Sequence, residues 1–119
     1  MTKEDFNQFV NMMQQAKKMK DSVYKDFAVS KSTDFQGMYL KRKRIDQRTF
    51  MTTKIYISEW VRDYMFEVRV TIHADGEKRK GVVPLEQNTL ECHRISAKII
   101  DFTEVEQEAI SMAQKLGWL

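Results

Sequence analysis

With 119 residues, of which 42% are hydrophobic and 31% charged, the chain has the size and composition of a globular protein with one modest core. No apolar run approaches the ~20 residues that a membrane helix needs, so we expect no membrane association. The formal net charge of +3 is unevenly distributed: residues 36–98 carry thirteen Lys and Arg against eight Asp and Glu, whereas residues 99–119 carry one against four. One proline and four glycines leave no flexible linker, so we expect a single domain over residues 1–119.

The cysteine content indicates a reducing compartment. Cys92 is the only cysteine, which excludes an intramolecular disulfide. Residues 1–6 lack the charged start and apolar stretch of a secretory signal. We therefore expect a cytoplasmic protein.

Residues 2–29 are predicted to form a long N-terminal helix. Thr2 is a plausible N-cap, and Ser30 begins the first cluster of turn-forming residues. A break near Asp21 and Ser22, followed by a second helical segment, is the alternative. One apolar stripe has the spacing of a helix; its members are Phe6, Phe9, Val10, Met13, Ala16, Met19 or Lys20, and Val23.

The middle of the chain is predicted to form four or five strands. Residues 36–46 and 49–61 are strand-like and flank a turn at 46–48. Residues 64–74 alternate strictly between apolar and polar side chains, which is typical of a strand with one buried face. The pair Asp75-Gly76 predicts a tight hairpin to a return strand at 78–84, and residues 90–100 are the last candidate strand.

The last element is predicted to be a helix that begins at Thr103. Thr103 and Glu106 have the spacing of a capping box, and Gly117 stands where a left-handed C-terminal cap is expected. The apolar stripe of this helix consists of Val105, Ala109, Met112, Ala113 and Leu116. The fold class is therefore α+β: an N-terminal helix, a four- to five-stranded antiparallel sheet and a C-terminal helix, with both helices on one sheet face.

The sequence contains no motif that predicts catalysis, a metal or a cofactor. Cys92, His93 and His73 are the only soft or imidazole ligands, and a structural zinc site needs four, usually in close pairs. The glycines are isolated, and the acidic residues near 104–108 suit the positive end of a helix dipole. We expect a protein without enzymatic activity and without a cofactor.

Basic residues gather in the predicted strands, and aromatic residues lie among them. Residues 41–44 are four consecutive cations, and residues 78–80 are three more. Cations that neutralise phosphates, beside rings that stack on bases, are the requirements of single-stranded nucleic-acid binding. The predicted nucleic-acid or partner-binding residues are Lys41, Arg42, Lys43, Arg44, Arg48, Lys54, Tyr56, Arg69, Lys78, Arg79 and Lys80.

Two alternatives to this interpretation stay open in the sequence. A lysine-rich edge strand also protects a sheet from edge-to-edge aggregation. Tyr56 faces outward only if Met51, Thr53, Ile55 and Ile57 face the core, and a bulge would reverse this. The strand register decides on which side of the sheet Tyr56 lies.

The expected function is a non-enzymatic binding protein that engages nucleic acid, or a protein of a nucleic-acid-handling complex, through the basic and aromatic sheet surface. The alternative is a small inhibitor or adaptor, of the kind that phages and mobile elements encode, that occludes a protein partner. Binding of a small ligand between helix and sheet is a third, lesser alternative. Trp118 and Leu119, apolar residues at the C-terminal end of this sequence, fold back onto the first helix or form a homodimer contact.

Overall fold

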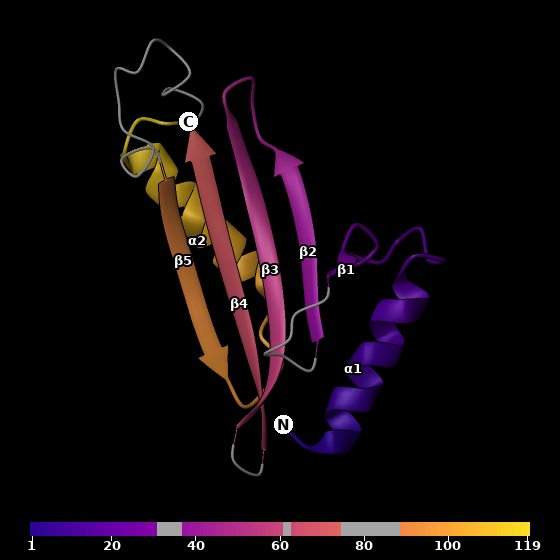
Figure 1. Ribbon diagram of the computed structural model, residues 1–119. Helices are drawn as coiled ribbons and strands as arrows, with labels where there is room; N and C mark the ends of the chain where they lie inside the picture. The colour runs from indigo at the N-terminus through magenta and orange to yellow at the C-terminus, as the bar shows by residue number, and fades with distance from the viewer. Residues whose placement is uncertain (31–36, 61–62, 75–88) are drawn as a thin grey trace.

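The computed structural model describes residues 1–30, 37–60, 63–74 and 89–119. The five strands form one antiparallel sheet in the order β1-β2-β3-β4-β5, so that each strand lies beside its neighbour in sequence (Figure 1). The elements follow in the order α1 (Lys3–Ala16), β1 (Ala28–Ser30), β2 (Gly37–Arg44), β3 (Thr49–Trp60), β4 (Asp63–Ala74), β5 (Thr89–Ser96) and α2 (Phe102–Lys115). Within these ranges, neither helix is long and apolar enough to cross a membrane.

The core lies between one face of the sheet and the two helices, which confirms the predicted α+β arrangement. The strict alternation in β4 has the predicted effect, because Phe66, Val68, Val70 and Ile72 are all fully buried. Helix α2 covers β3, β4 and β5 from behind in the view of Figure 1. Helix α1 reaches the same core through Phe9, whose ring meets that of Phe66 edge-on at 5.1 Å.

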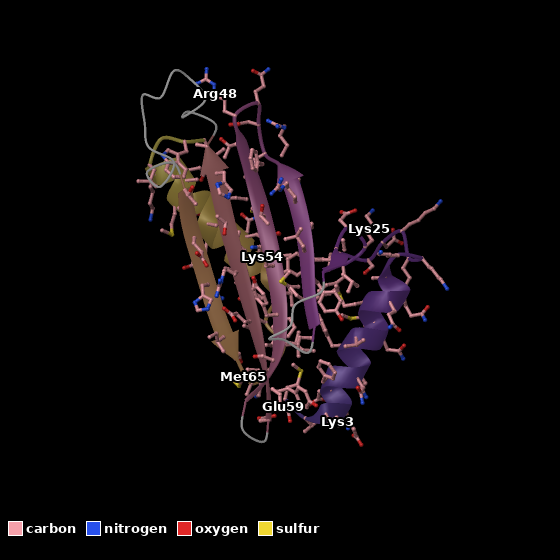
Figure 2. The ribbon with its side chains drawn as sticks, viewed as in Figure 1. Lys3, Lys25, Arg48, Lys54, Glu59 and Met65 are labelled. Carbon is pink, nitrogen blue, oxygen red and sulfur yellow. The ribbon has the colours of Figure 1, made fainter. Side chains whose placement is uncertain are left out.

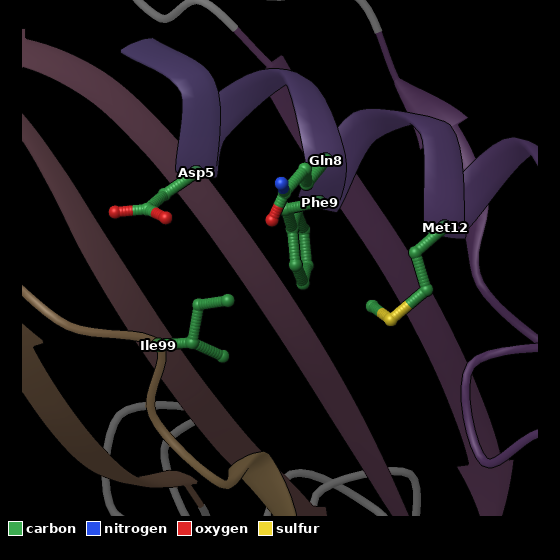
Figure 3. A pocket seen from close by; sticks show the side chains of 5 residues that line it. All are labelled: Asp5, Gln8, Phe9, Met12 and Ile99. Carbon is green, nitrogen blue, oxygen red and sulfur yellow. The ribbon is translucent and has the colours of Figure 1, made fainter. Parts of the chain in front are cut away.

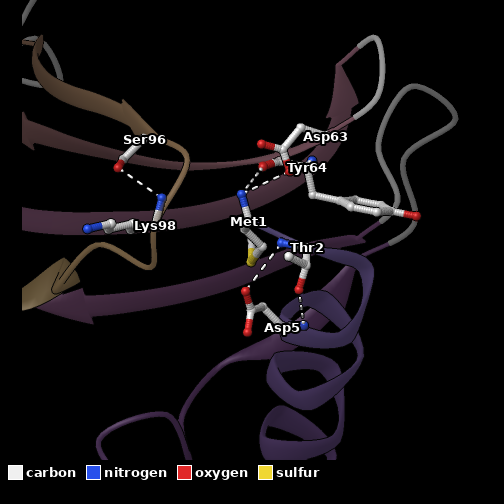
Figure 4. Close-up of polar contacts among 7 residues, drawn as sticks. All are labelled: Met1, Thr2, Asp5, Asp63, Tyr64, Ser96 and Lys98. Atoms are coloured by element: carbon white, nitrogen blue, oxygen red, sulfur yellow. Dashed lines mark hydrogen bonds and ion pairs between the residues drawn. The ribbon is translucent and has the colours of Figure 1, made fainter.

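Polar contacts attach the start of α1 to β4 (Figure 4). The Met1 ammonium donates to Asp63 Oδ1 at 3.0 Å and to the Tyr64 carbonyl at 3.1 Å, and it lowers the pKa of the Asp63 carboxyl. Thr2 caps α1 as predicted: its Oγ1 accepts from the Asp5 amide, and the Asp5 carboxylate accepts from the Thr2 amide. These contacts hold the N-terminal end of α1 beside the first residues of β4.

The prediction of one helix over residues 2–29 is wrong in its length, because α1 ends at Ala16. Residues 17–27 form successive turns that lead into β1, a strand that the sequence did not predict. Met19 and Val23 are each 59% exposed, so the buried stripe does not continue past Ala16. Ser22 Oγ accepts from the Tyr24 amide at 3.2 Å, a local bond that competes with helical pairing.

The predicted strands agree with β2, β3, β4 and β5 to within a few residues at their ends. The largest difference is in the last of these, predicted over 90–100, since β5 ends at Ser96. The turn at 46–48 is confirmed: the Ile45 amide donates to the Thr49 carbonyl at 2.8 Å. The Asp-Gly hairpin and the return strand at 78–84 lie outside the described residues.

Helix α2 begins earlier than predicted, and its N-cap is Asp101 instead of Thr103. Asp101 Oδ1 accepts from the amide and from the hydroxyl of Thr103, at 3.0 and 2.6 Å. The predicted capping box is wrong because the Glu106 side chain is turned toward the sheet, where it contacts Thr53 and Lys41. The C-terminal cap is confirmed: Gly117 has a φ of 78°, and the Trp118 amide donates to the Ala113 carbonyl at 2.9 Å.

The Asp101 cap leads to a stability prediction. Replacing Asp101 with alanine should lower the free energy of unfolding by about 1 kcal/mol, because the first turn of α2 loses its acceptor. Asp101→Asn should retain most of the stability, since an amide oxygen also caps. Urea denaturation of both variants provides the measurement, and an alanine variant as stable as the wild type would contradict this cap.

Candidate nucleic-acid interface

The second face of the sheet is not covered by either helix, and we call it the open face (Figure 1). Side chains alternate along each strand, and paired residues of neighbouring strands point to the same side. Thr53 contacts Glu106 of α2, which fixes the helix-covered side of β3 and, through the register, of β2, β4 and β5. The open face consists of Met38, Leu40, Arg42, Arg44, Phe50, Thr52, Lys54, Tyr56, Ser58, Met65, Glu67, Arg69, Thr71, His73, Thr89, Glu91, His93 and Ile95.

Two arginines of β2 lie over an aromatic ring at the β2–β3 end of the open face. The guanidinium carbons of Arg42 and Arg44 lie 5.4 and 5.7 Å from the centre of the half-buried Phe50 ring. On the other side of Phe50, the His73 ring lies at 5.6 Å. We call these four residues the Phe50 cluster. It combines cationic charge with an aromatic surface, the combination that single-stranded nucleic acid requires.

The cations on the β2–β3 side of the open face have no acidic partner within the described ranges. The ion pairs among the described residues involve other cations, so Arg42, Arg44 and Lys54 are not neutralised by a described carboxylate. Lys54 lies in the middle of the face and Arg48 at its end, in the turn between β2 and β3 (Figure 2). This side of the face therefore carries a net positive charge.

On the β4–β5 side, acids and bases compensate each other. Glu67 Oε1 contacts Arg69 Nη2 at 2.8 Å and His93 Nε2 at 2.7 Å, and Arg69 Nε lies 3.0 Å from Glu91 Oε1. The Arg69 guanidinium is also 5.4 Å from the centre of the Tyr56 ring. Burial raises the pKa of the Tyr56 hydroxyl, so that it is neutral at physiological pH. Among the described residues of the open face, the cations without an acidic partner thus lie on the β2–β3 side.

The structure brings part of the predicted site together. Arg42, Arg44, Lys54, Tyr56 and Arg69 lie on the face that is turned away from the helices. Tyr56 is nevertheless only 7% exposed, so its ring is not accessible to a partner in this structure. Arg48 borders the face in the turn. Lys78, Arg79 and Lys80 lie outside the described residues.

Lys41 and Lys43 project to the helix-covered side of the sheet. Lys43 is exposed there. Lys41 has a side chain only 13% exposed, and its Nζ pairs with Glu106 Oε2 at 2.9 Å and lies 4.6 Å from the centre of the Phe102 ring. Glu106 also accepts a hydrogen bond from Thr53 Oγ1. Lys41 is therefore a core contact and is not accessible to a partner in this structure.

Sequence reasoning missed Phe50, His73, Glu67 and His93 as residues of this face. A signal for Phe50 was present: a hairpin that turns at 46–48 pairs Arg44 with Phe50, as observed. The contact of Glu67 with His93 depends on the pairing of β4 with β5, whose residues are 26 positions apart. No local pattern indicates that pairing.

Trp118 and Leu119 are half-buried and pack against the core of their own chain. Trp118 lines an open cleft with Asp46, Gln47 and Arg48, at the β2–β3 turn and not at α1. The two residues therefore fold back, but onto a different part of the molecule than α1.

A second surface feature is an apolar groove beside α1 (Figure 3). Asp5, Gln8, Phe9 and Met12 of the helix face Ile99, in the segment that follows β5, across a cavity of about 190 Å³. Met12 is 38% exposed and Ile99 50% exposed, while Phe9 is buried. We call this the α1 groove.

The described residues contain no cluster of His, Cys, Asp and Glu that could hold a metal ion. Burial raises the pKa of the Cys92 thiol, and its Sγ lies 3.3 Å from Met112 Sδ, an environment that disfavours a reactive thiolate. No family model, curated protein or solved structure matches this chain. Function is therefore inferred from the residues and their geometry alone.

Proposed function

We propose that this chain is a non-enzymatic protein that binds single-stranded nucleic acid along the β2–β3 side of its open face. The observation that supports this most directly is the Phe50 cluster, in which two arginines of β2 that no described carboxylate neutralises lie over a half-buried ring. A base stacks on the aromatic surface, and the arginines contact the phosphates on either side of it. Lys54 and Arg48 extend the positive track along the same side.

A single strand suits this surface better than a duplex does. The bases of a single strand are free to stack on exposed side chains, whereas those of a duplex are stacked on one another. The open face presents strands and no protruding helix for a groove. On the β4–β5 side Glu67 and Glu91 compensate the charge of Arg69, so that side attracts phosphate less than the β2–β3 side does.

The two faces of β2 allow a matched test of this proposal. In the variant Arg42→Ala/Arg44→Ala, affinity for a short single-stranded oligonucleotide should fall, and the slope of log affinity against log salt should flatten by about 0.7 for each phosphate that is no longer neutralised. Lys43→Ala removes a cation from the same strand but on the opposite side, so affinity should stay close to wild type. Filter binding at several salt concentrations measures both quantities.

Two outcomes would contradict the proposal. A wild-type protein that binds no oligonucleotide at low salt would remove it. Equal decreases in affinity for the double variant and for Lys43→Ala would show that net charge alone attracts the nucleic acid. Residues 41–44 of β2 extend past its pairing with β1, which involves residues 38–40. If instead the arginines protect this part of the strand from edge-to-edge pairing, the wild type should not bind and the double variant should scatter more light as it aggregates.

The second candidate function is an inhibitor or adaptor that occludes a protein partner, and the α1 groove favours it. Exposed apolar side chains such as Met12 and Ile99 are typical of protein contacts. A complex formed there should persist as the salt concentration rises, because apolar contacts depend little on ionic strength, whereas phosphate contacts weaken steeply. Salt dependence therefore distinguishes the two candidates.

A further inference from the structure

The cleft beside Trp118 lies at the β2–β3 turn, at the end of the sheet that carries the Phe50 cluster. Its volume is about 360 Å³, and the described residues that line it are Asp46, Gln47, Arg48 and Trp118. Arg44 connects the two places: its guanidinium lies over the Phe50 ring, and its Nη1 donates to the Gln47 carbonyl at 3.0 Å. Arg48 is two residues before Phe50, about 7 Å along an extended chain. Trp118 packs against the core on the helix-covered side, whereas Phe50 is on the open face, so a strand bound at Phe50 reaches the cleft around the β2–β3 turn.

The side chains of the cleft offer an aromatic surface, hydrogen-bond donors and a hydrogen-bond acceptor. The indole of Trp118 is half-buried and offers an aromatic surface. The planar Arg48 guanidinium presents several N–H groups as hydrogen-bond donors. Asp46 is an acceptor: the Arg48 amide donates to its Oδ1 at 2.8 Å and lowers the pKa of the carboxyl, so the group is ionised at neutral pH and keeps further acceptor capacity.

These contacts favour one base over the other three. Guanine presents two adjacent N–H donors, N1 and N2, which one carboxylate can accept together, and two acceptors, O6 and N7, which a guanidinium can contact together. Adenine lacks the paired donors, and uracil places carbonyl oxygens beside its single N–H, where they repel a carboxylate. Cytosine offers one amino group beside an acceptor. Guanine alone matches both Asp46 and Arg48.

We propose that the Trp118 cleft is a guanine-binding subsite, a proposal that rests on the nucleic-acid binding proposed above. The base stacks on Trp118, Asp46 accepts from its Watson–Crick edge, and Arg48 donates to O6 and N7. The chain then prefers single strands with a guanine next to the base that stacks on Phe50.

The test compares three single-stranded oligonucleotides by fluorescence anisotropy: a uridine run, the same run with one guanine, and the same run with one adenine. The wild type should bind the guanine oligonucleotide about tenfold more tightly than the adenine one. Asp46→Asn keeps an oxygen for the Arg48 amide but replaces one acceptor with a donor. It should abolish the preference for guanine and leave affinity for the uridine run unchanged or slightly higher.

Two Trp118 variants separate stacking from folding. Trp118→Phe keeps an aromatic surface and should retain most of the preference. Trp118→Leu keeps an apolar contact with the core but removes the stack, so affinity for the guanine oligonucleotide should fall about tenfold. Thermal unfolding of each variant establishes that it is folded.

The outcomes distinguish this subsite from the proposed function. If the wild type binds all three oligonucleotides equally, or if Asp46→Asn keeps the guanine preference, the subsite is overturned while the open-face proposal stands. If the wild type binds none of them, both proposals fall. Loss of the preference in Asp46→Asn and in Trp118→Leu, with uridine binding retained, supports the subsite.

Discussion

Substituting Lys41 with alanine is expected to lower the free energy of unfolding by about 3–5 kcal/mol, because it leaves a buried carboxylate without its cation. The Glu106 side chain is 10% exposed, and Lys41 Nζ lies 2.9 Å from Glu106 Oε2. The ammonium also lies over the rings of Phe102 and Phe27, at 4.6 and 5.3 Å from their centres. Urea denaturation, followed by circular dichroism, measures the decrease in stability.

The double variant Lys41→Met/Glu106→Leu tests the cause of that decrease. It removes both charges and keeps apolar volume, so it should recover most of the stability and can equal the wild type. Lys43→Ala, two residues along the same strand and exposed, should change stability by less than about 0.5 kcal/mol. If Lys41→Ala is as mild as Lys43→Ala, the pair is not buried in solution.

Replacing Val68 with lysine is expected to unfold the protein. Val68 is fully buried in the middle of the sheet, opposite Ile55 of β3 and Arg94 of β5. An unpaired ammonium at this position costs several kcal/mol, which is comparable to the total stability of about 5–15 kcal/mol that a small domain has. Loss of the far-UV circular dichroism of the sheet, together with loss of cooperative thermal unfolding, is the expected result.

Ile95→Lys is the matched control for this prediction. Ile95 is also a β-branched strand residue, but it lies on the open face, 45% exposed and opposite Glu67. A lysine there remains hydrated beside a carboxylate, so stability should stay within about 1 kcal/mol of wild type. Similar effects of the two substitutions would contradict the assignment of buried and open faces.

Strands β2, β3, β4 and β5 were predictable because their residues carry a local signal, which the three-residue β1 lacks. Alternation in residues 64–74 identified β4 and its buried face, and the short connection at 46–48 identified the β2–β3 hairpin. Period-two alternation has a direct physical cause, since successive side chains of a strand point to opposite faces. Antiparallel pairing and the placement of both helices on one face followed from these elements.

The helix boundaries were less predictable because tertiary contacts decide them. Glu106 has the spacing of a capping residue, but pairing with Lys41 and Thr53 across the core holds it away from the helix end. Residues 17–27 have helical spacing, yet Phe27 packs against Phe102 of α2 instead of following α1. The partners in these contacts are more than fifty residues apart, beyond the reach of a local pattern.

The basic and aromatic composition of the strands led to the candidate site, and the observed strand register shows which of its residues lie on the open face. Alternation separated Arg42 and Arg44 from Lys41 and Lys43, but only the structure shows which pair faces α2. The positive charge of the predicted site is also partly cancelled, because Glu67 and Glu91 contact Arg69. Such cancellation arises from strand pairing and is invisible to a count of charges.

The strand order has a consequence for folding. Because each strand pairs with its neighbour in sequence, the sheet can grow one hairpin at a time, with little loop-closure entropy to overcome at most steps. Helix α2, which covers β3, β4 and β5, is synthesised after the whole sheet. During translation, the apolar face around Val68 and Val70 therefore stays exposed to solvent until residues 102–115 leave the ribosome. In that interval the nascent chain is most prone to aggregate and most in need of a chaperone.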